Sequence, residues 1–297
     1  ASSKFNGKTK DIFIKQGIIQ EIADNIVKKS AKEINLDNLH VSQGWLDSSV
    51  CFGEPGLEER ETIENGSRTA CLSGFTDIIL NSNTLPVIDS KADVIYVKSK
   101  NNNKALKIHP LGALTLKSEG SEMAELHEMF ESGAVGFYDY KMSVKNPNLL
   151  KTALQYVQHF DGLIMTFPFE KSICQNGQMN EGEISTLYGL EGIPSLSEEI
   201  TLERDLKILE YTGGKLFIPT ISTSKSVELI KNAKRKGLQI ITSVSINNIF
   251  FNEKKLINFD TRFKVLPPLR SEEDRLILVN ALSEGIIDFC TSDHCPI

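Results

Sequence analysis

The stretch from Asp47 to Gly56, DSSVCFGEPG, decides how the rest of the chain is interpreted. It follows an apolar approach, places Ser49 and Cys51 two residues apart, and ends in a tight Glu-Pro-Gly turn. Side chains two residues apart in a strand point to the same face. We therefore expect a strand that presents Ser49 and Cys51 together at its carboxyl end.

Outward from this stretch, apolar runs of strand length alternate with helical patterns, as in a parallel sheet with crossover helices. The runs are GWLDSSV (44–50), GFTDIIL (74–80), KIHPLGAL (107–114), AVGFYDY (134–140), GLIMTF (162–167), KLFIPTI (215–221), LQIITSVSI (238–246) and GIIDFCTSD (285–293). Eight strand–helix units over roughly 250 residues predict an α/β fold of the (β/α)8 TIM-barrel type. An open doubly wound sheet is the structural alternative.

Residues 1–43 show a different pattern and are predicted to form a small β element. The segment DIFIKQGIIQEI contains two short apolar runs around Gln16 and Gly17, which is typical of a hairpin. Within the barrel, residues 90–100 fit a strand or a helix, and their position in a crossover favours a helix. Asn146 and Ser271 are predicted to cap the starts of two helices.

Composition limits the class of protein. The 297 residues include 33 basic and 39 acidic side chains, a net charge of −6, and the chain offers no basic patch for nucleic acid. No apolar run reaches the roughly 20 residues that span a bilayer, and the first ten residues contain no apolar signal core. The five cysteines form no CxxC pair, which favours thiols in a reducing compartment. These features predict a cytoplasmic protein.

Barrels of this type carry their functional groups at the carboxyl ends of the strands. The predicted strand ends offer mainly hydroxyls, amides and a few carboxylates: Asp47, Ser49, Cys51, Asn81, Asn83, Thr84, Thr115, Asp139, Phe167, Glu170, Thr220, Ser222, Thr223, Asn247, Asn248, Asp293 and His294. We expect Asn83, Asp139 and Asp293 to converge on one pocket. Asp139 and Asp293 form either a general acid–base pair or two loop anchors.

Histidines are scarce where a hydrolytic metal site would need them. Only His294 falls at the carboxyl end of a predicted strand. The other four precede a strand, begin one or fall in helical patterns: His40, His109, His127 and His159. No G-x-S-x-G elbow precedes a helix and no phosphate-binding GxxxxGK[ST] loop is present. Cys51 is either a nucleophile acting with His294 or a buried structural thiol.

Eight motifs together resemble the dihydroorotases of the amidohydrolase superfamily in order and spacing. They are FGEPG, SNTLPVID, GAVGFYDY, NGQMNEGEIS, LYGLEGIPSLSEEITLERD, ISTSKSVELIKNAKRKGL, PPLRSEEDR and GIIDFCTSDHCP, and the resemblance runs from about residue 10 to the end. It implies a (β/α)8 barrel with a small β-sandwich built from both chain ends. It also implies zinc-dependent interconversion of dihydroorotate and carbamoyl aspartate in pyrimidine synthesis.

The chain departs from the family at the residues that carry this chemistry. Where the family has D-x-H-x-H-x-R-E-P-G, Ser49 and Cys51 replace the two metal-binding histidines, and Gly53 replaces the arginine that binds the substrate carboxylate. The histidines of the fifth, sixth and seventh strands correspond to Phe167, Thr220, Asn247 and Asn248.

Some positions of the family site are retained. Asp139 corresponds to one member of the Asp-Asp pair after the fourth strand, Asn83 to the asparagine of P-N-T, and Asp293 to the aspartate of T-D-H-A-P-H. Asp293 is thus a candidate, vestigial catalytic residue. Asn83, Asp139 and His294 are candidate substrate-binding residues, and no residue is assigned to a metal.

The resemblance and the departures together predict a non-catalytic dihydroorotase homologue without a cofactor, acting as a structural or partner subunit. Its expected partner is aspartate transcarbamoylase or a second copy of the chain. One alternative is an active cyclic-amide hydrolase that binds zinc through Asp139, Asp293, Cys51 and His294. Another is a small-molecule-binding barrel in which Asn83 fixes an anionic or amide ligand.

The family also begins with an earlier strand and continues past TDHAPH with a helix and the strands that complete the sandwich. We therefore expect an incomplete β-sandwich part at residues 1–43, an amidohydrolase-like barrel at 44–297, and no C-terminal remainder in this sequence.

Overall fold

The computed structural model describes residues 3–102, 105–174 and 176–296. The first two residues and the last residue of the predicted domains lie outside these ranges. The chain divides into two compact units, Ala1–Gln43 and Gly44–Ile297. No helix in the described ranges combines the length and the apolar character that a bilayer crossing requires.

The first unit contains the predicted hairpin. Strands β1 (Asp11–Lys15) and β2 (Ile18–Ala23) pair antiparallel. Gln16 and Gly17 join them, with φ values of 54° and 75°. A two-residue turn with positive φ at both positions matches the twist of the paired strands, which is why the sequence signal is reliable here.

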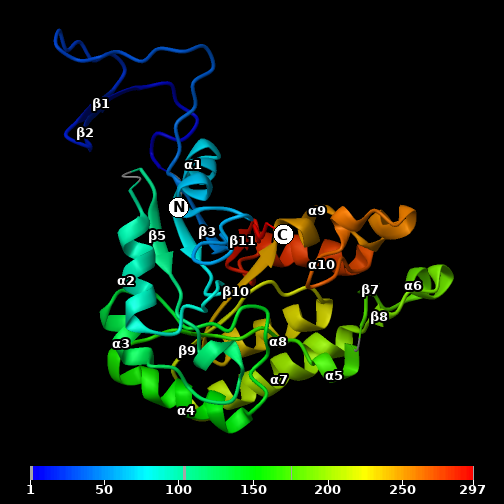
Figure 1. Ribbon diagram of the computed structural model, residues 1–297. Coiled ribbons are helices and arrows are strands. Elements are labelled where there is room, and N and C mark those ends of the chain that lie inside the picture. Colours follow the sequence, from blue (N-terminus) through cyan, green and yellow to red (C-terminus); the bar gives the residue numbers. More distant parts are fainter. Residues whose placement is uncertain (1–2, 103–104, 175, 297) are drawn as a thin grey trace. The chain divides into compact units, whose positions relative to one another are not determined.

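The second unit is built on two parallel sheets, drawn in Figure 1. One contains β3 (Trp45–Val50), β4 (Phe75–Leu80) and β5 (Lys107–Pro110) in this order. The other contains β11 (Phe289–Thr291), β10 (Gln239–Ser245), β9 (Lys215–Ile218) and β6 (Ile164–Met165).

Single parallel bridges join the two sheets into a ring of eight segments. Phe137 bridges to Gly112 on one side and to Ile164 on the other, and Val50 bridges to His294 where the first and last segments meet. Pairing therefore runs around the whole ring, and the predicted (β/α)8 architecture is confirmed.

The fourth predicted strand, residues 134–140, is wrong as a regular strand, since it pairs only through the bridges of Phe137. Pro110, Gly112 and Gly136 lie in this part of the ring. Proline lacks an N–H donor and glycine lacks a side chain to pack, so both interrupt regular ladders. The fifth predicted strand is likewise short, with only Ile164 and Met165 assigned to β6.

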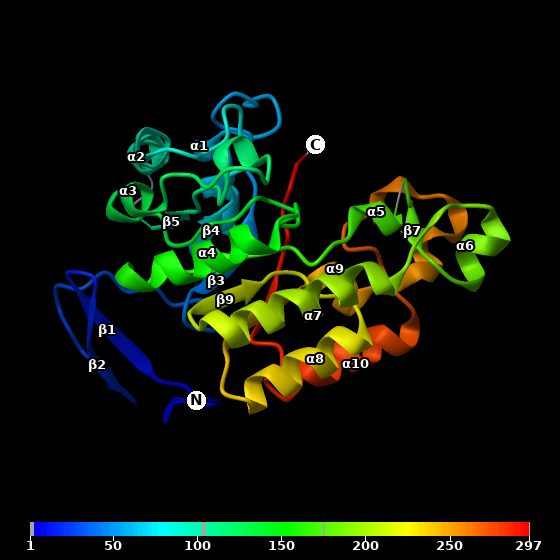
Figure 2. The same ribbon diagram turned by 90° about the horizontal axis from the view of Figure 1, so that it is seen from below.

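Helices follow the strands around the ring. They are α1 (Ile63–Leu72), α2 (Lys91–Lys100), α3 (Leu126–Glu131), α4 (Pro147–Val157), α7 (Ser195–Thr212), α8 (Ser224–Arg235) and α10 (Glu272–Ser283). Figure 2 shows α4, α7, α8 and α10 lying side by side, and neighbouring members of this row are in contact. Helix α2 confirms the helical interpretation of residues 90–100. The side chains of Asn146 and Ser271 accept the predicted capping hydrogen bonds.

Two excursions interrupt this pattern. The first contains α5 (Lys171–Cys174), β7 (Met179–Asn180), α6 (Glu183–Tyr188) and β8 (Gly192–Ile193). The second contains α9 (Ile246–Phe250) and two 3-10 turns, Glu253–Asn258 and Thr261–Phe263. They contact each other through α6 and the turn Glu253–Asn258.

A buried polar network holds the first excursion to the barrel. The guanidinium of Arg270, a residue only 3% exposed, donates to Asn180 Oδ1 at 2.8 Å, to the carbonyl of Ile193 at 2.7 Å and to Ser222 Oγ at 3.0 Å. Its charge lies 4.0 Å from the buried carboxylate of Glu198. Glu198 in turn accepts from the backbone N–H of Ser222 at 2.9 Å. One cation thus satisfies groups from three separate segments.

We expect Arg270→Ala to lower the free energy of unfolding by about 3–5 kcal/mol, because Glu198 would remain as an uncompensated buried charge. Urea unfolding measures this change. The matched control is Arg262→Ala, which removes an exposed arginine paired with Asp260 and should change stability by at most about 0.5 kcal/mol. Equal effects of the two substitutions would contradict the structural role of the network.

Candidate functional site

The candidate site lies where β3 and β11 meet at the carboxyl ends of the strands. Ser49 Oγ accepts a hydrogen bond from Asn81 Nδ2 at 3.1 Å and donates to Asp293 Oδ1 at 3.3 Å. The other oxygen of Asp293, Oδ2, accepts from Lys141 Nζ at 2.8 Å. Asp293 is therefore hydrogen-bonded through both carboxylate oxygens, and its side chain is only 7% exposed.

Electrostatics at Asp293 reflect two opposed causes. Burial raises the pKa of its carboxyl, whereas the charge of Lys141 and the hydrogen bonds from Lys141 and Ser49 lower it; the net shift is upward. Both Asp293 and Lys141 have positive φ values, 54° and 52°. Non-glycine residues adopt this conformation only where the surrounding structure compensates its cost. The ion pair supplies such compensation at the mouth of the barrel.

Asp139 is bound to the loop that follows β5. Its Oδ1 accepts from the backbone N–H groups of Leu114 at 2.9 Å and Thr115 at 3.0 Å, and its Oδ2 accepts from the Thr115 hydroxyl at 2.6 Å. Burial raises the pKa of Asp139, and the Thr115 and Leu114 hydrogen bonds oppose this shift. In this arrangement Asp139 acts as a loop anchor.

The other predicted site residues, Asn83 and His294, make no hydrogen bond to Asp139 or Asp293 in the described ranges. Burial raises the pKa of Tyr138, and the charges of Asp293 and Asp139 add to this shift. The expectation that Asn83, Asp139 and Asp293 converge on one pocket stays a prediction. His294 Nε2 lies 2.6 Å from the carboxylate of Glu61.

Two thiols form a second group at the junction of β3 and β11, which we call the β3–β11 seam. Cys51 is buried and accepts a weak hydrogen bond from Asn81 Nδ2 at 3.5 Å. Burial raises the pKa of Cys51 well above its ordinary value. The neighbouring Cys295 has its pKa lowered to about 6, first by the hydrogen bond with Cys51 and further by Tyr140 and the charge of Lys141. Cys295 is thus the thiolate of the pair.

Lys141, Tyr140 and Cys295 were not singled out from the sequence. Lys141 follows Asp139 by two residues in the YDYK segment, and Cys295 directly follows His294. The sequence therefore places Lys141 and Cys295 close to predicted site residues. Their partners were not, because Lys141 and Asp293 are separated by 152 residues.

The residues at the family's metal positions do not fit a zinc centre. Ser49 is engaged by Asn81 and Asp293, and Phe167 belongs to an apolar cluster inside the barrel. Thr220 offers a buried hydroxyl only. Within the described ranges no group of three or more His, Cys, Asp or Glu side chains is arranged to hold a metal ion. The ammonium group of Lys141 also lies where it would repel a cation bound to Asp293.

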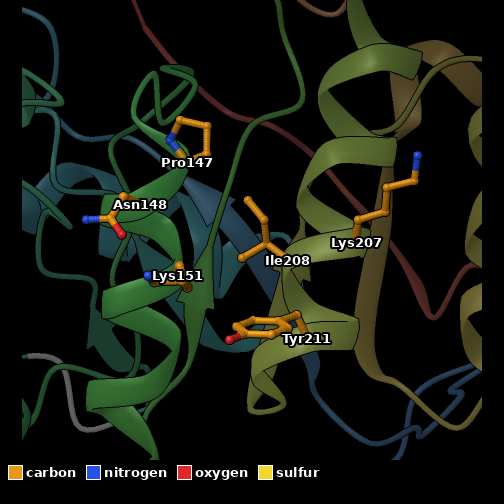
Figure 3. A pocket seen from close by; sticks show the side chains of 6 residues that line it. All are labelled: Pro147, Asn148, Lys151, Lys207, Ile208 and Tyr211. Atoms are coloured by element: carbon orange, nitrogen blue, oxygen red, sulfur yellow. The ribbon is translucent and has the colours of Figure 1, made fainter.

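Two surface cavities lie away from this site. Figure 3 shows one between α4 and α7, lined by Pro147, Asn148, Lys151, Lys207, Ile208 and Tyr211. The other is lined by Leu46, Asp77, Ile79, His109 and Val135. Neither contains a residue from the Ser49–Asp293–Lys141 group. The lining of the cavity in Figure 3 contains no carboxylate, thiol or imidazole.

Comparison with solved structures supports the fold. The L-hydantoinase from Arthrobacter aurescens superposes with a TM-score of 0.81 at 22% identity, over 97% of this chain and 66% of that one. The dihydropyrimidinase from Brevibacillus agri NCHU1002 gives 0.77 at 18% identity, over 98% of this chain and 66% of that one. These similarities show that the chain has the fold of these proteins.

Sequence comparison then identifies the family. Residues 40–226 match the family model described as Dihydro-orotase-like. The dihydroorotase of Pelotomaculum thermopropionicum is 36% identical over 287 residues, which are 97% of this chain and 67% of that protein. The dihydroorotase of Thermoanaerobacter sp. is 37% identical over 289 residues, again 97% of this chain and 67% of that protein.

The chain therefore belongs to the dihydroorotase family, which confirms the resemblance found in its motifs. It spans about two thirds of the length of these relatives.

We expect Lys141→Met to destabilise the protein in a pH-dependent way. The pKa of Asp293 is already raised in the folded state, and loss of the ammonium group raises it further. When the pKa of a carboxyl group is higher in the folded than in the unfolded protein, its contribution to stability is fully present below the unfolded-state pKa, about 3.9 for aspartate. This contribution is lost as the pH rises through the folded-state pKa. The variant should thus be close to wild type near pH 4 and less stable by about 2 kcal/mol at pH 7.

Urea unfolding between pH 4 and pH 7 measures this difference. Lys145→Met is the control, because it removes the same charge from an exposed position four residues away. A Lys141→Met effect that does not change with pH would contradict the assignment of Lys141 as the counter-charge of Asp293.

Proposed function

We propose that this protein is a non-catalytic dihydroorotase homologue that serves as a structural or partner subunit in pyrimidine biosynthesis. The observation that carries the proposal is the Lys141–Asp293 ion pair, with Ser49 as the third partner. The carboxylate retained from the family site is neutralised by a protein cation and hydrogen-bonded through both oxygens.

Within the described ranges, the site lacks the group of metal ligands that zinc-dependent hydrolysis requires. A catalytic zinc ion lowers the pKa of bound water to about 7, and the side chains that the resemblance aligns with the family's metal positions are poor zinc ligands. Gly53 also leaves no room for the family arginine. A Cβ atom at this position would lie 1.7 Å from the carbonyl oxygen of Leu57. A bidentate clamp on the substrate carboxylate would therefore require a rebuilt turn.

The alternative of an active enzyme with an atypical zinc site draws on Asp139, Asp293, Cys51 and His294. Each of these side chains has a partner of its own. Asp139 binds Thr115, Asp293 binds Lys141, Cys51 contacts Cys295, and His294 contacts Glu61. Convergence of the four on one ion would require these contacts to break, so we favour the non-catalytic function.

A small-molecule-binding barrel remains a second candidate because of two buried amide groups. The side-chain oxygens of Asn81 and Asn83 are buried without a hydrogen-bond partner in the described structure. A buried acceptor left unsatisfied is costly, and a ligand with an N–H or O–H donor would satisfy it. Such a ligand would raise the melting temperature of the protein in a concentration-dependent way.

We expect protein purified with added zinc to hold well under one equivalent of tightly bound metal and to hydrolyse no dihydroorotate above the buffer rate. Elemental analysis and a high-concentration turnover assay measure the two quantities. The dihydroorotase of Pelotomaculum thermopropionicum, treated identically, is the positive control. About one equivalent of zinc with chelator-sensitive turnover would establish the active-enzyme alternative. A thermal shift with dihydroorotate or carbamoyl aspartate, without turnover, would instead support the ligand-binding candidate.

The partner role is supported by an apolar surface on the two excursions. The rings of Tyr188 and Phe259 are in contact, 5.5 Å between centroids, and link the excursions. Leu187 and Phe250 on the same excursions are 75% and 72% exposed. Exposed apolar side chains that gather on one surface mark protein–protein contact sites. We propose that aspartate transcarbamoylase or a second copy of the chain covers it.

We expect the chain to co-elute with aspartate transcarbamoylase of the same organism, or to form a dimer, in size-exclusion chromatography with light scattering. A Leu187→Ser/Phe250→Ser double variant should weaken the association, because it removes two highly exposed apolar side chains from this surface. Leu72→Ser on α1, equally exposed but outside the excursions, is the control. A monomer that binds no aspartate transcarbamoylase would contradict the partner proposal.

A further inference from the structure

The bridge that closes the barrel also aligns two cysteines. Val50 and His294 pair in parallel, and the backbone N–H of Cys51 donates to the carbonyl of His294 at 2.7 Å. One residue further along both segments, Cys51 lies next to Cys295. Neighbouring strands are about 4.8 Å apart. This spacing falls within the range of Cα separations that disulfides span, about 4.4–6.8 Å.

The electrostatics of the two thiols agree with the proximity that the register implies. The thiols of Cys51 and Cys295 each shift the pKa of the other, and Tyr140 acts on both. Cys51 is buried, whereas Cys295 is partly exposed. An oxidant in solution therefore reaches the pair through Cys295.

We propose that Cys51 and Cys295 form a redox-active dithiol that hydrogen peroxide converts into a disulfide across the β3–β11 seam. No residue of this pair is needed as a metal ligand or catalytic group for this role. The inference rests on the non-catalytic function proposed above in one respect, because it requires Cys51 to be free of metal.

The oxidation proceeds in two balanced steps. The thiolate of Cys295 attacks one oxygen of hydrogen peroxide, the O–O bond breaks, and Cys295 becomes a sulfenic acid while hydroxide leaves. The sulfur of Cys51 then attacks the Cys295 sulfur, the S–O bond breaks, and water leaves with the proton of Cys51. Two thiols and one peroxide thus give one disulfide and two waters. The lowered pKa of Cys295 makes it the first nucleophile.

Cys290 provides a contrast within the same strand region. It lies in β11, and burial raises its pKa to about 11. Its thiol is therefore protonated at neutral pH and reacts slowly with peroxide. Selective oxidation of Cys295 over Cys290 distinguishes the proposed pair from general oxidation of cysteines.

The disulfide would have a mechanical consequence for the barrel. It would link the first and the eighth strand regions, whose contacts otherwise are non-covalent. A crosslink between residues so distant in sequence restricts the unfolded chain strongly. We expect the oxidised protein to melt at least about 5 °C above the reduced protein, and dithiothreitol to reverse the shift.

The test uses the full chain treated with one to ten equivalents of hydrogen peroxide. Digestion with trypsin and an aspartate-specific protease places Cys51 in the peptide 47–60, Cys290 in 288–292 and Cys295 in 293–297. Mass spectrometry is expected to find peptides 47–60 and 293–297 joined, with a loss of two hydrogens. Peptide 288–292 should remain reduced.

Variants separate the pair from its surroundings. Cys51→Ser and Cys295→Ser should each abolish the crosslink and the peroxide-induced melting shift, and Cys51→Ser should accumulate the sulfenic acid at Cys295, which dimedone traps. Cys290→Ser should retain both effects. Should Cys51→Ser fail to fold, peptide mapping of the wild type still decides the question. Absence of the 47–60/293–297 crosslink in peroxide-treated wild type, or a crosslink that involves Cys290 equally, would overturn the proposal.

Discussion

Closure of the ring between β3 and β11 is the constraint on which the rest of the barrel depends. Asp47 in β3 accepts hydrogen bonds from the hydroxyl of Thr291 and from the backbone N–H of Ser292 at 3.3 Å. Buried polar groups are costly unless they are paired. The seam is built so that each carboxylate that enters it meets donors from the opposite strand region. Asp47 and Asp293 are both satisfied in this way.

The same constraint explains how a family barrel accommodates poor zinc ligands at the metal positions. A buried carboxylate needs a positive partner or strong donors, whether that partner is a metal ion or a side chain. Lys141 provides the charge for Asp293, and Thr115 with the backbone of residues 114–115 provides donors for Asp139. Each retained carboxylate thus keeps a structural role in the fold.

The β3–β11 seam also places two thiols where the resemblance aligns a metal-binding histidine of the family. Cys51 stands at a position that carries a metal-binding histidine in the resemblance, and Cys295 is set beside it by the Val50–His294 bridge. Lys141 contributes to both features, because its charge pairs with Asp293 and also stabilises the Cys295 thiolate. The ion pair and the dithiol are therefore parts of one electrostatic arrangement.

The sequence by itself determined the local elements and the family. Periodicity predicted the alternation of strands and helices, the two apolar runs around Gln16 and Gly17 predicted the hairpin, and the capping residues Asn146 and Ser271 predicted two helix starts, because these signals act over a few residues. Motif order identified the dihydroorotase family. The tertiary structure alone decided that Lys141 pairs with Asp293 across 152 residues and that Asp139 anchors a loop. These pairings follow from the register at which the ring closes, and no local pattern encodes that register.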